Sequence, residues 1–129
     1  MVGLEREARR MARHIDLGRR GERLAEEYLT AAGHRVVDRN WRSPRGELDL
    51  VTIDREQVVA VEVKTRTSLD FGHPFEAIDR RKLERVYRLG WDWCAAHGMA
   101  GSRLRVDAVA VVTGRAGERP VIEHLEGVR

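Results

Sequence analysis

Cysteine is almost absent from this chain, since Cys94 is the only one among 129 residues. A single thiol excludes a disulfide framework and a cysteine-based metal cluster. Cys94 lies in a Trp-Cys-Ala-Ala run of an expected helix, where a buried, unreactive thiol is more common than a nucleophile. The chain also lacks an apolar run long enough to cross a bilayer, and its start lacks the apolar core of a signal peptide. We therefore expect a cytoplasmic protein with no membrane partner.

Histidine is sparse and shows no spacing typical of metal ligands. We interpret each of the five as a surface or packing residue: His14, His34, His73, His97 and His124. A net charge of +3, from 24 basic and 21 acidic residues, is also too small by itself to indicate a polyanion partner. Arginine nevertheless crowds the first 23 residues and outnumbers lysine. This suits bidentate phosphate contacts, although genomic base composition explains it equally well.

The length suits a single domain, and hydrophobic periodicity predicts its elements. Residues 1–16 are rich in arginine and only weakly amphipathic, so we interpret them as a basic N-terminal extension, a mobile or marginal helix, outside the domain of residues 17–129. Within that domain we expect helices at 17–32 and 79–97, and strands at 35–41, 47–53, 58–66, 104–112 and 121–125. The first three strands should form an antiparallel meander, and the strand-helix-strand passage from 58 to 112 predicts a parallel crossover. The fold class is therefore α/β, with a mixed sheet flanked by helices.

Charged residues interrupt two of the expected strands. Glu62 and Lys64 lie in the run Val-Ala-Val-Glu-Val-Lys, whose composition is typical of a buried central strand. Residues two apart in a strand point to the same face, so these two side chains lie together. A salt bridge between them is one explanation, because an unpaired charge would be costly in such a strand.

Asp49 is not explained by that salt bridge. Alternation predicts that its side chain points away from Leu48 and Leu50, on the face of Glu47 and Val51. A solvated outer face is the simplest explanation for one such aspartate. Three groups converging from neighbouring strands are better explained by a cation that the carboxylates of Asp49 and Glu62 hold and that Lys64 flanks. Oxygen ligands favour Mg²⁺ or Mn²⁺ over zinc.

A family resemblance strengthens this interpretation. Asp49 with Glu62-Val63-Lys64 resembles the PD-(D/E)xK nuclease signature, although Leu48 stands where that motif has proline. Together with flanking motifs, the chain resembles the YraN family of uncharacterised bacterial proteins over residues 18–113. The matching motifs are Gly18-Arg19-Arg20-Gly21-Glu22, Ala25, Tyr28-Leu29, Gly33, Asn40-Trp41-Arg42, Gly46 to Val51, Val61 to Arg66, Phe71-Gly72, Lys82 and Arg105-Val106-Asp107. That family is similar to archaeal Holliday-junction resolvases, which implies a restriction-endonuclease-like fold.

The resemblance also implies roles for individual residues. Asp49 and Glu62 would ligate Mg²⁺ or Mn²⁺ together with the backbone carbonyl of Val63, and Lys64 would orient or deprotonate the attacking water. Glu22 would join the metal site, in agreement with its place at the margin of the apolar stripe of its helix. An acid that interacts with the helix dipole is the alternative for Glu22.

Further residues are assigned to substrate binding and to structure. Arg66 and Lys82 are candidates for phosphate contacts, and Asp107 is expected to be structural. The implied activity is metal-dependent endonucleolytic cleavage of DNA, with branched or flapped substrates preferred, and a second copy of the chain is kept as a candidate partner. A nucleic-acid-binding module that cleaves nothing is the alternative. A protein-interaction domain is the third interpretation, which an exposed patch of tryptophans would support: Trp41, Trp91 and Trp93.

Overall fold

The fold is an α/β arrangement of one five-stranded sheet and two α-helices, described here from a computed structural model that covers residues 2–129. In chain order the elements are α1 (Val2–Ala31), β1 (Arg35–Ser43), β2 (Gly46–Asp54), β3 (Gln57–Arg66), the short 3₁₀ helix η1 (Pro74–Ala77), α2 (Arg80–Ala96), β4 (Leu104–Val112) and β5 (Val121–Leu125). This order agrees with the prediction from the sequence, apart from η1. The architecture is consistent with a restriction-endonuclease-like fold.

The sheet has the strand order β1-β2-β3-β4-β5. β1, β2 and β3 pair antiparallel, β3 and β4 pair parallel through the crossover that contains α2, and β5 closes the far edge antiparallel to β4. The expected meander and the expected parallel crossover are both confirmed. β3 is therefore a central strand, hydrogen-bonded on both sides.

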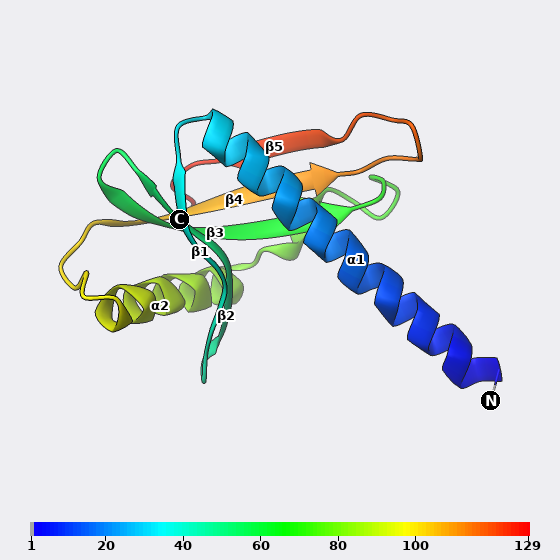
Figure 1. The fold of residues 1–129 in the computed structure, drawn as a ribbon, viewed down its shortest axis with the longest axis horizontal. Helices are drawn as coiled ribbons and strands as arrows, with labels where there is room; N and C mark the ends of the chain where they lie inside the picture. Colours follow the sequence, from blue (N-terminus) through cyan, green and yellow to red (C-terminus); the bar gives the residue numbers. More distant parts are fainter. Residues whose placement is uncertain (1) are drawn as a thin grey trace.

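Each helix buries its apolar side against one face of the sheet, and Figure 1 shows α1 and α2 on opposite sides of it. On the α1 face, Ala25 and Leu29 pack with alternate residues of β3 and β4. On the α2 face, Leu89 and Trp93 pack with Val58 and Ala60 of β3. This two-sided coverage explains the nearly continuous apolar sequence of β3 and β4.

Helix α1 is much longer than predicted. It begins at Val2 instead of Leu17, and its first half extends beyond the sheet, in dark blue in Figure 1. The side chains of residues 2–16 are all exposed, including Leu4 at 72%. No proline interrupts residues 2–31, so a helix whose second half is docked can propagate outward at little cost. Met1, the first residue of the expected extension, lies outside the described residues.

Gly21 sets how closely α1 approaches the sheet. A Cβ atom at this position would lie 1.8 Å from Oγ1 of Thr65 on β3. Only glycine permits that separation, because any side chain there would overlap the threonine. The next residue, Glu22, is thereby brought to the edge of β3.

The tryptophans and the cysteine are mostly interior. Trp93 is buried and Trp41 packs against the same core, so only Trp91, at 49% exposure, faces solvent. The exposed patch that a protein-interaction domain would present is therefore not formed by these three residues. Cys94 is buried and burial raises the pKa of its thiol, in agreement with the expected unreactive role. Neither α-helix of the described chain is long and apolar enough to span a membrane.

Candidate metal and catalytic site

The candidate site forms where β2 separates from β3. Their backbone pairing ends at Leu50↔Val61, whereas β3 continues to Arg66 in register with β4. Beyond the separation, the backbone N–H of Val63 donates a 2.8 Å hydrogen bond to Oδ2 of Asp49. The carboxylate thus occupies the place that a strand backbone would otherwise take. N–H and C=O of one residue point to the same side of an extended strand, so the Val63 carbonyl also faces this gap.

The separation of the strands changes which way the neighbours of Asp49 point. Leu48 and Val51 belong to the core cluster beneath α2, whereas Leu50 belongs to the cluster beneath α1. The prediction that Leu48 and Leu50 share a face, with Asp49 and Val51 on the other, is therefore wrong. Strict alternation holds only in a regular strand, and β2 loses its partner at this point.

Asp49 lies in an environment that disfavours its charge. Burial raises the pKa of its carboxyl group to about 8, and the negative charges of Glu62 and Glu22 contribute in the same direction. The Val63 hydrogen bond and the positive charge of Lys64 oppose this rise without cancelling it. At neutral pH the group is therefore protonated unless a cation replaces the proton.

Glu62 and Lys64 form the ion pair that their spacing predicts. Nζ of Lys64 lies 3.1 Å from Oε1 of Glu62, and the side chains are 25% and 18% exposed respectively. Val61 and Val63 pack beneath α1, so alternation directs this pair to the opposite side of β3. The pair is close to Asp49, whose pKa both charges affect.

Glu22 reaches the site from α1 and is held by a residue to which the sequence assigned no role. Nδ2 of Asn40 donates to Oε2 of Glu22 and to Oε1 of Glu47, both at 3.0 Å. Asn40 adopts a left-handed backbone conformation (φ 49°), which asparagine tolerates better than most residues, and it lies across from Asp49 between the paired residues of β1 and β2. Burial raises the pKa of Glu22, the Asn40 hydrogen bond opposes this, and the charge of Glu47 adds to it.

Asn40 and Glu47 are therefore site residues that the sequence analysis missed. Asn40 was part of a quoted motif, and Glu47 lies two residues before Asp49, yet neither signal specified a contact. A surface hollow of about 480 Å³ opens beside α1 at this point. Its lining residues are His14, Ile15, Gly18, Arg19, Glu22, Asn40, Arg42 and Glu47.

The two residues predicted to contact phosphate, Arg66 and Lys82, lie away from the hollow beside Glu22. Nζ of Lys82 donates to the Ala77 carbonyl at 2.9 Å, and Nη1 of Arg66 donates to the carbonyl of Thr65 at 3.0 Å. Neither side chain lines the hollow beside Glu22, whereas Arg19 and Arg42 do. Together with Lys64, these two arginines are cations placed near the carboxylates.

The donor set fits a hard divalent cation. It consists of carboxylate oxygens and one backbone carbonyl, with no sulfur or imidazole, which suits Mg²⁺ or Mn²⁺. The raised pKa of Asp49 means that a cation at this carboxyl group would take the place of a proton. Within residues 2–129 the ligand atoms of these acids do not all come within 4.8 Å of one another.

Two of the histidines lie close together in the structure. His34 and His124 lie with ring centroids 5.7 Å apart, and together with Glu126 they form a group whose ligand atoms all lie within 4.8 Å. The burial of His34 agrees with the packing role expected for it, and its contact with His124 goes beyond that expectation. The strands bring positions 34 and 124 together, and sequence spacing carries no information about that contact.

Asp107 is fully buried and has the structural role expected for it. Its carboxylate accepts hydrogen bonds from Arg105, from the His124 ring at 2.7 Å and from the Gly127 N–H at 3.0 Å. Burial acts to raise the pKa of Asp107, but these bonds outweigh it and lower the pKa to about 2. The network fixes the C-terminal segment against β4.

Comparison with known proteins places the chain in a family. A model described as "Uncharacterised protein family UPF0102" matches residues 21–111. The chain belongs to this family. The resemblance to the YraN family drawn from the motifs is thereby confirmed. The match includes Glu22, Asp49, Glu62 and Lys64 and leaves the projecting part of α1 outside.

UPF0102 relatives are similar over nearly the whole chain. A UPF0102 protein of Paenarthrobacter aurescens (strain TC1) is 53% identical over 112 residues, which is 87% of this chain and 92% of the relative. One from Renibacterium salmoninarum is 50% identical over 118 residues, 92% of this chain and 99% of the relative. One from Rhodococcus jostii (strain RHA1) is 46% identical over 115 residues, 89% and 97% respectively. These names state family membership and no activity.

Proposed function

We propose that this UPF0102 member is a Mg²⁺- or Mn²⁺-dependent endonuclease that hydrolyses DNA phosphodiester bonds, with branched or flapped DNA preferred. One observation carries the proposal. The carboxyl group of Asp49 is fixed by the Val63 N–H in a half-buried position beside the charges of Glu62, Glu22 and Lys64. A structural role alone would not require several acids side by side, where burial raises the pKa of Asp49 to about 8 and the charges of Glu62 and Glu22 add to that rise.

Each residue has a role in this proposal. Asp49, Glu62 and the Val63 carbonyl would hold the cation, which when bound supplies a water of lowered pKa and neutralises charge that develops on the phosphate. Lys64 orients or deprotonates the attacking water, whose oxygen bonds to phosphorus while one phosphorus–oxygen ester bond breaks. Glu22, held by Asn40, helps to fix the metal or the water.

Substrate binding would rest on phosphate contacts. Arg19 and Arg42 line the hollow beside the carboxylates, and the arginines of the projecting half of α1 extend away from it. Arg66 and Lys82 remain candidates for phosphate contacts farther from the carboxylates. Guanidinium–phosphate contacts position a duplex without reading its sequence, so affinity should fall steeply with salt and differ little between sequences of equal shape.

A DNA-binding module that cleaves nothing is the second candidate. The ion pair between Lys64 and Glu62 favours it, because a lysine held by a glutamate is less able to accept a proton from water. The two candidates make the same prediction for DNA affinity. They differ in whether Mn²⁺ produces cleavage.

The test is a cleavage screen with labelled single-stranded, duplex, flap and four-way DNA at equal length, with Mn²⁺ and with chelator. The proposal expects Mn²⁺-dependent products with the intact protein and none with Asp49→Asn or Glu62→Gln. Asp70→Asn, in an exposed loop, is the matched control and should cleave normally. Binding to the panel without any Mn²⁺-dependent product would favour the module that cleaves nothing. Products that persist in both site variants would come from another site or a contaminant.

A further inference from the structure

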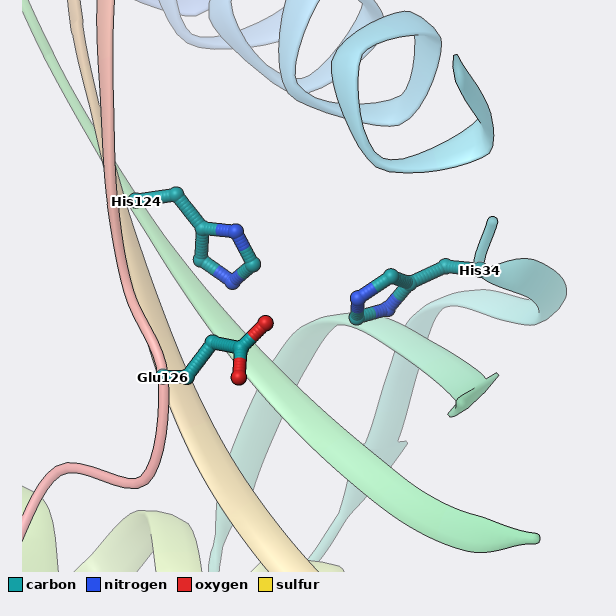
Figure 2. A group of neighbouring side chains, drawn as sticks. All are labelled: His34, His124 and Glu126. Atoms are coloured by element: carbon teal, nitrogen blue, oxygen red, sulfur yellow. The ribbon is translucent and has the colours of Figure 1, made fainter. Parts of the chain in front are cut away.

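A second cluster of metal-ligating side chains lies away from the carboxylates discussed above. His34 precedes β1, His124 lies in β5 and Glu126 follows that strand, so the group joins segments about ninety residues apart. Figure 2 shows both rings and the carboxylate directed into one space below the end of α1. Among residues 2–129 this is the group of three such side chains whose ligand atoms all lie within 4.8 Å.

The two rings are oriented by fixed oxygen partners. Nε2 of His124 lies 2.7 Å from Oδ2 of the buried Asp107, and Nδ1 of His34 lies 2.8 Å from Oγ1 of the buried Thr52. Each ring therefore has one nitrogen held by an oxygen atom in the interior. The second nitrogen of His124, Nδ1, would be its ligand atom. The second nitrogen of His34, Nε2, faces Oδ2 of Asp54 at 3.6 Å, a contact that a bound metal ion would replace. A histidine whose second nitrogen is bound to a carboxylate is typical of metal-ligating histidines, because this contact fixes the tautomer and raises ligand basicity.

One of the two imidazoles lies in an environment that disfavours its positive charge. Burial lowers the pKa of His34, which keeps this imidazole neutral at pH 7. Arg105 pairs with Asp54 and Asp107 and so balances the interior acids. Glu126 is at the exposed end of the cluster, where Nη2 of Arg55 donates to its Oε2 at 3.2 Å. The three ligand atoms all lie within 4.8 Å of one another, and rotation of the Glu126 side chain would bring its carboxylate to the roughly 3.4 Å between ligands of a tetrahedral zinc ion.

We propose that His34, His124 and Glu126 form a binding site for a zinc-class transition metal ion that joins the end of β5 to the α1–β1 connection. Two imidazoles and one carboxylate supply three protein ligands and leave a fourth position for water. Imidazole favours Zn²⁺ over Mg²⁺, so this site and the oxygen-only site at Asp49 select different ions. The metal ties the edge strand β5, which pairs only with β4, to the opposite end of the chain.

The proposal is independent of the nuclease proposal and is tested without any activity assay. Zn²⁺ binding to the full chain is measured by isothermal titration calorimetry and by thermal unfolding. We expect one Zn²⁺ per chain and a rise in Tm of about 5–10 °C at a concentration about a hundredfold above Kd. Hydrogen exchange of the β5 amides should slow in the same samples.

Glu126→Gln is the decisive variant, because the partner of this exposed carboxylate is the exposed Arg55, so the change weakens a surface ion pair and removes no buried hydrogen bond. It should keep its metal-free Tm and lose zinc affinity by about tenfold or more, as should His124→Ala if it folds. Glu123→Gln, on the same strand, is the matched control and should bind Zn²⁺ normally. The double variant Asp49→Asn, Glu62→Gln should also keep its Zn²⁺ response.

Three results would overturn the proposal. The first is absence of Zn²⁺ binding by the full chain. The second is unchanged zinc affinity in Glu126→Gln, and the third is loss of the Zn²⁺ response in the Asp49 and Glu62 double variant. The last result would place the zinc among the carboxylates and would leave the histidine cluster as a hydrogen-bonded network only.

Discussion

Replacement of Asp49 by asparagine should stabilise the protein in the absence of metal. The carboxyl group has a pKa of about 8 in the folded state, against 3.8 as the ordinary value. The folded protein therefore retains a proton between these two values that the unfolded chain releases, so the contribution of this group to stability falls as pH rises through this window. Asparagine has the shape of the protonated group, does not titrate, and can still accept the Val63 hydrogen bond.

The magnitude follows from the width of this window. Between 3.8 and pH 7 lie about three pH units, each equivalent to about 1.4 kcal/mol, which sets an upper limit of about 4 kcal/mol at pH 7. Rearrangement of the carboxylates and entry of water reduce this value, and we expect a gain of about 1–3 kcal/mol. For a chain of 129 residues this corresponds to a rise in Tm of about 4–12 °C.

The assay is thermal unfolding of the wild type, Asp49→Asn and the control Asp70→Asn in chelator, at pH values from 4 to 8.5. The gain from Asp49→Asn should be near zero at pH 4, increase through neutrality and level off above pH 8. A destabilised variant, or a gain that is the same at pH 4.5 and pH 7.5, would refute the account of the site as a set of mutually repelling acids. Added Mn²⁺ should raise the Tm of the wild type and not that of Asp49→Asn.

Three further predictions concern the scaffold. Gly21→Ala should lower the free energy of unfolding by about 1–3 kcal/mol in urea titrations, because the added Cβ would overlap Thr65. Gly18→Ala is the control and should be neutral or stabilising, because nothing lies within 4 Å of a Cβ at that position. Equal effects of the two variants would contradict the close approach of α1 to the sheet. Deletion of residues 2–16 should leave Tm nearly unchanged and weaken DNA binding in fluorescence anisotropy, and a large loss of Tm would show that this segment packs against the domain. Asp107→Asn should cost about 3–5 kcal/mol, because it removes the buried charge that pairs with Arg105 and His124 and leaves Asp54 as the remaining acidic partner of Arg105. A cost below about 1 kcal/mol would contradict the ion-pair network.

The order and type of the elements were determined by local sequence. Apolar residues at helical spacing, such as Ala25 and Leu29, and the nearly continuous apolar strands of the centre specified the helices, the meander and the parallel crossover. The spacing of Glu62 and Lys64 likewise specified their pairing, because residues two apart in a strand share a face whatever the rest of the fold does. The start of α1 could not be found in this way, since periodicity is weak where a helix has no partner to bury against.

The geometry of the site depended on contacts between distant segments. The end of the β2–β3 pairing turned Asp49 toward the Val63 N–H, Gly21 let α1 approach β3, and Asn40 joined Glu22 to Glu47. Periodicity assumes a regular strand, so it could not predict the position where one strand leaves its neighbour.

The histidine cluster shows the same limit most clearly. The spacing of His34 and His124 in the sequence is not typical of metal ligands. The two residues come together only because β5 pairs with β4 at the edge of the sheet. Sequence thus determined which elements form and which side chains carry chemistry, because those depend on local periodicity and residue type. Tertiary structure decided which of these side chains meet, because strand register and the packing of α1 across the sheet are cooperative properties of the whole chain.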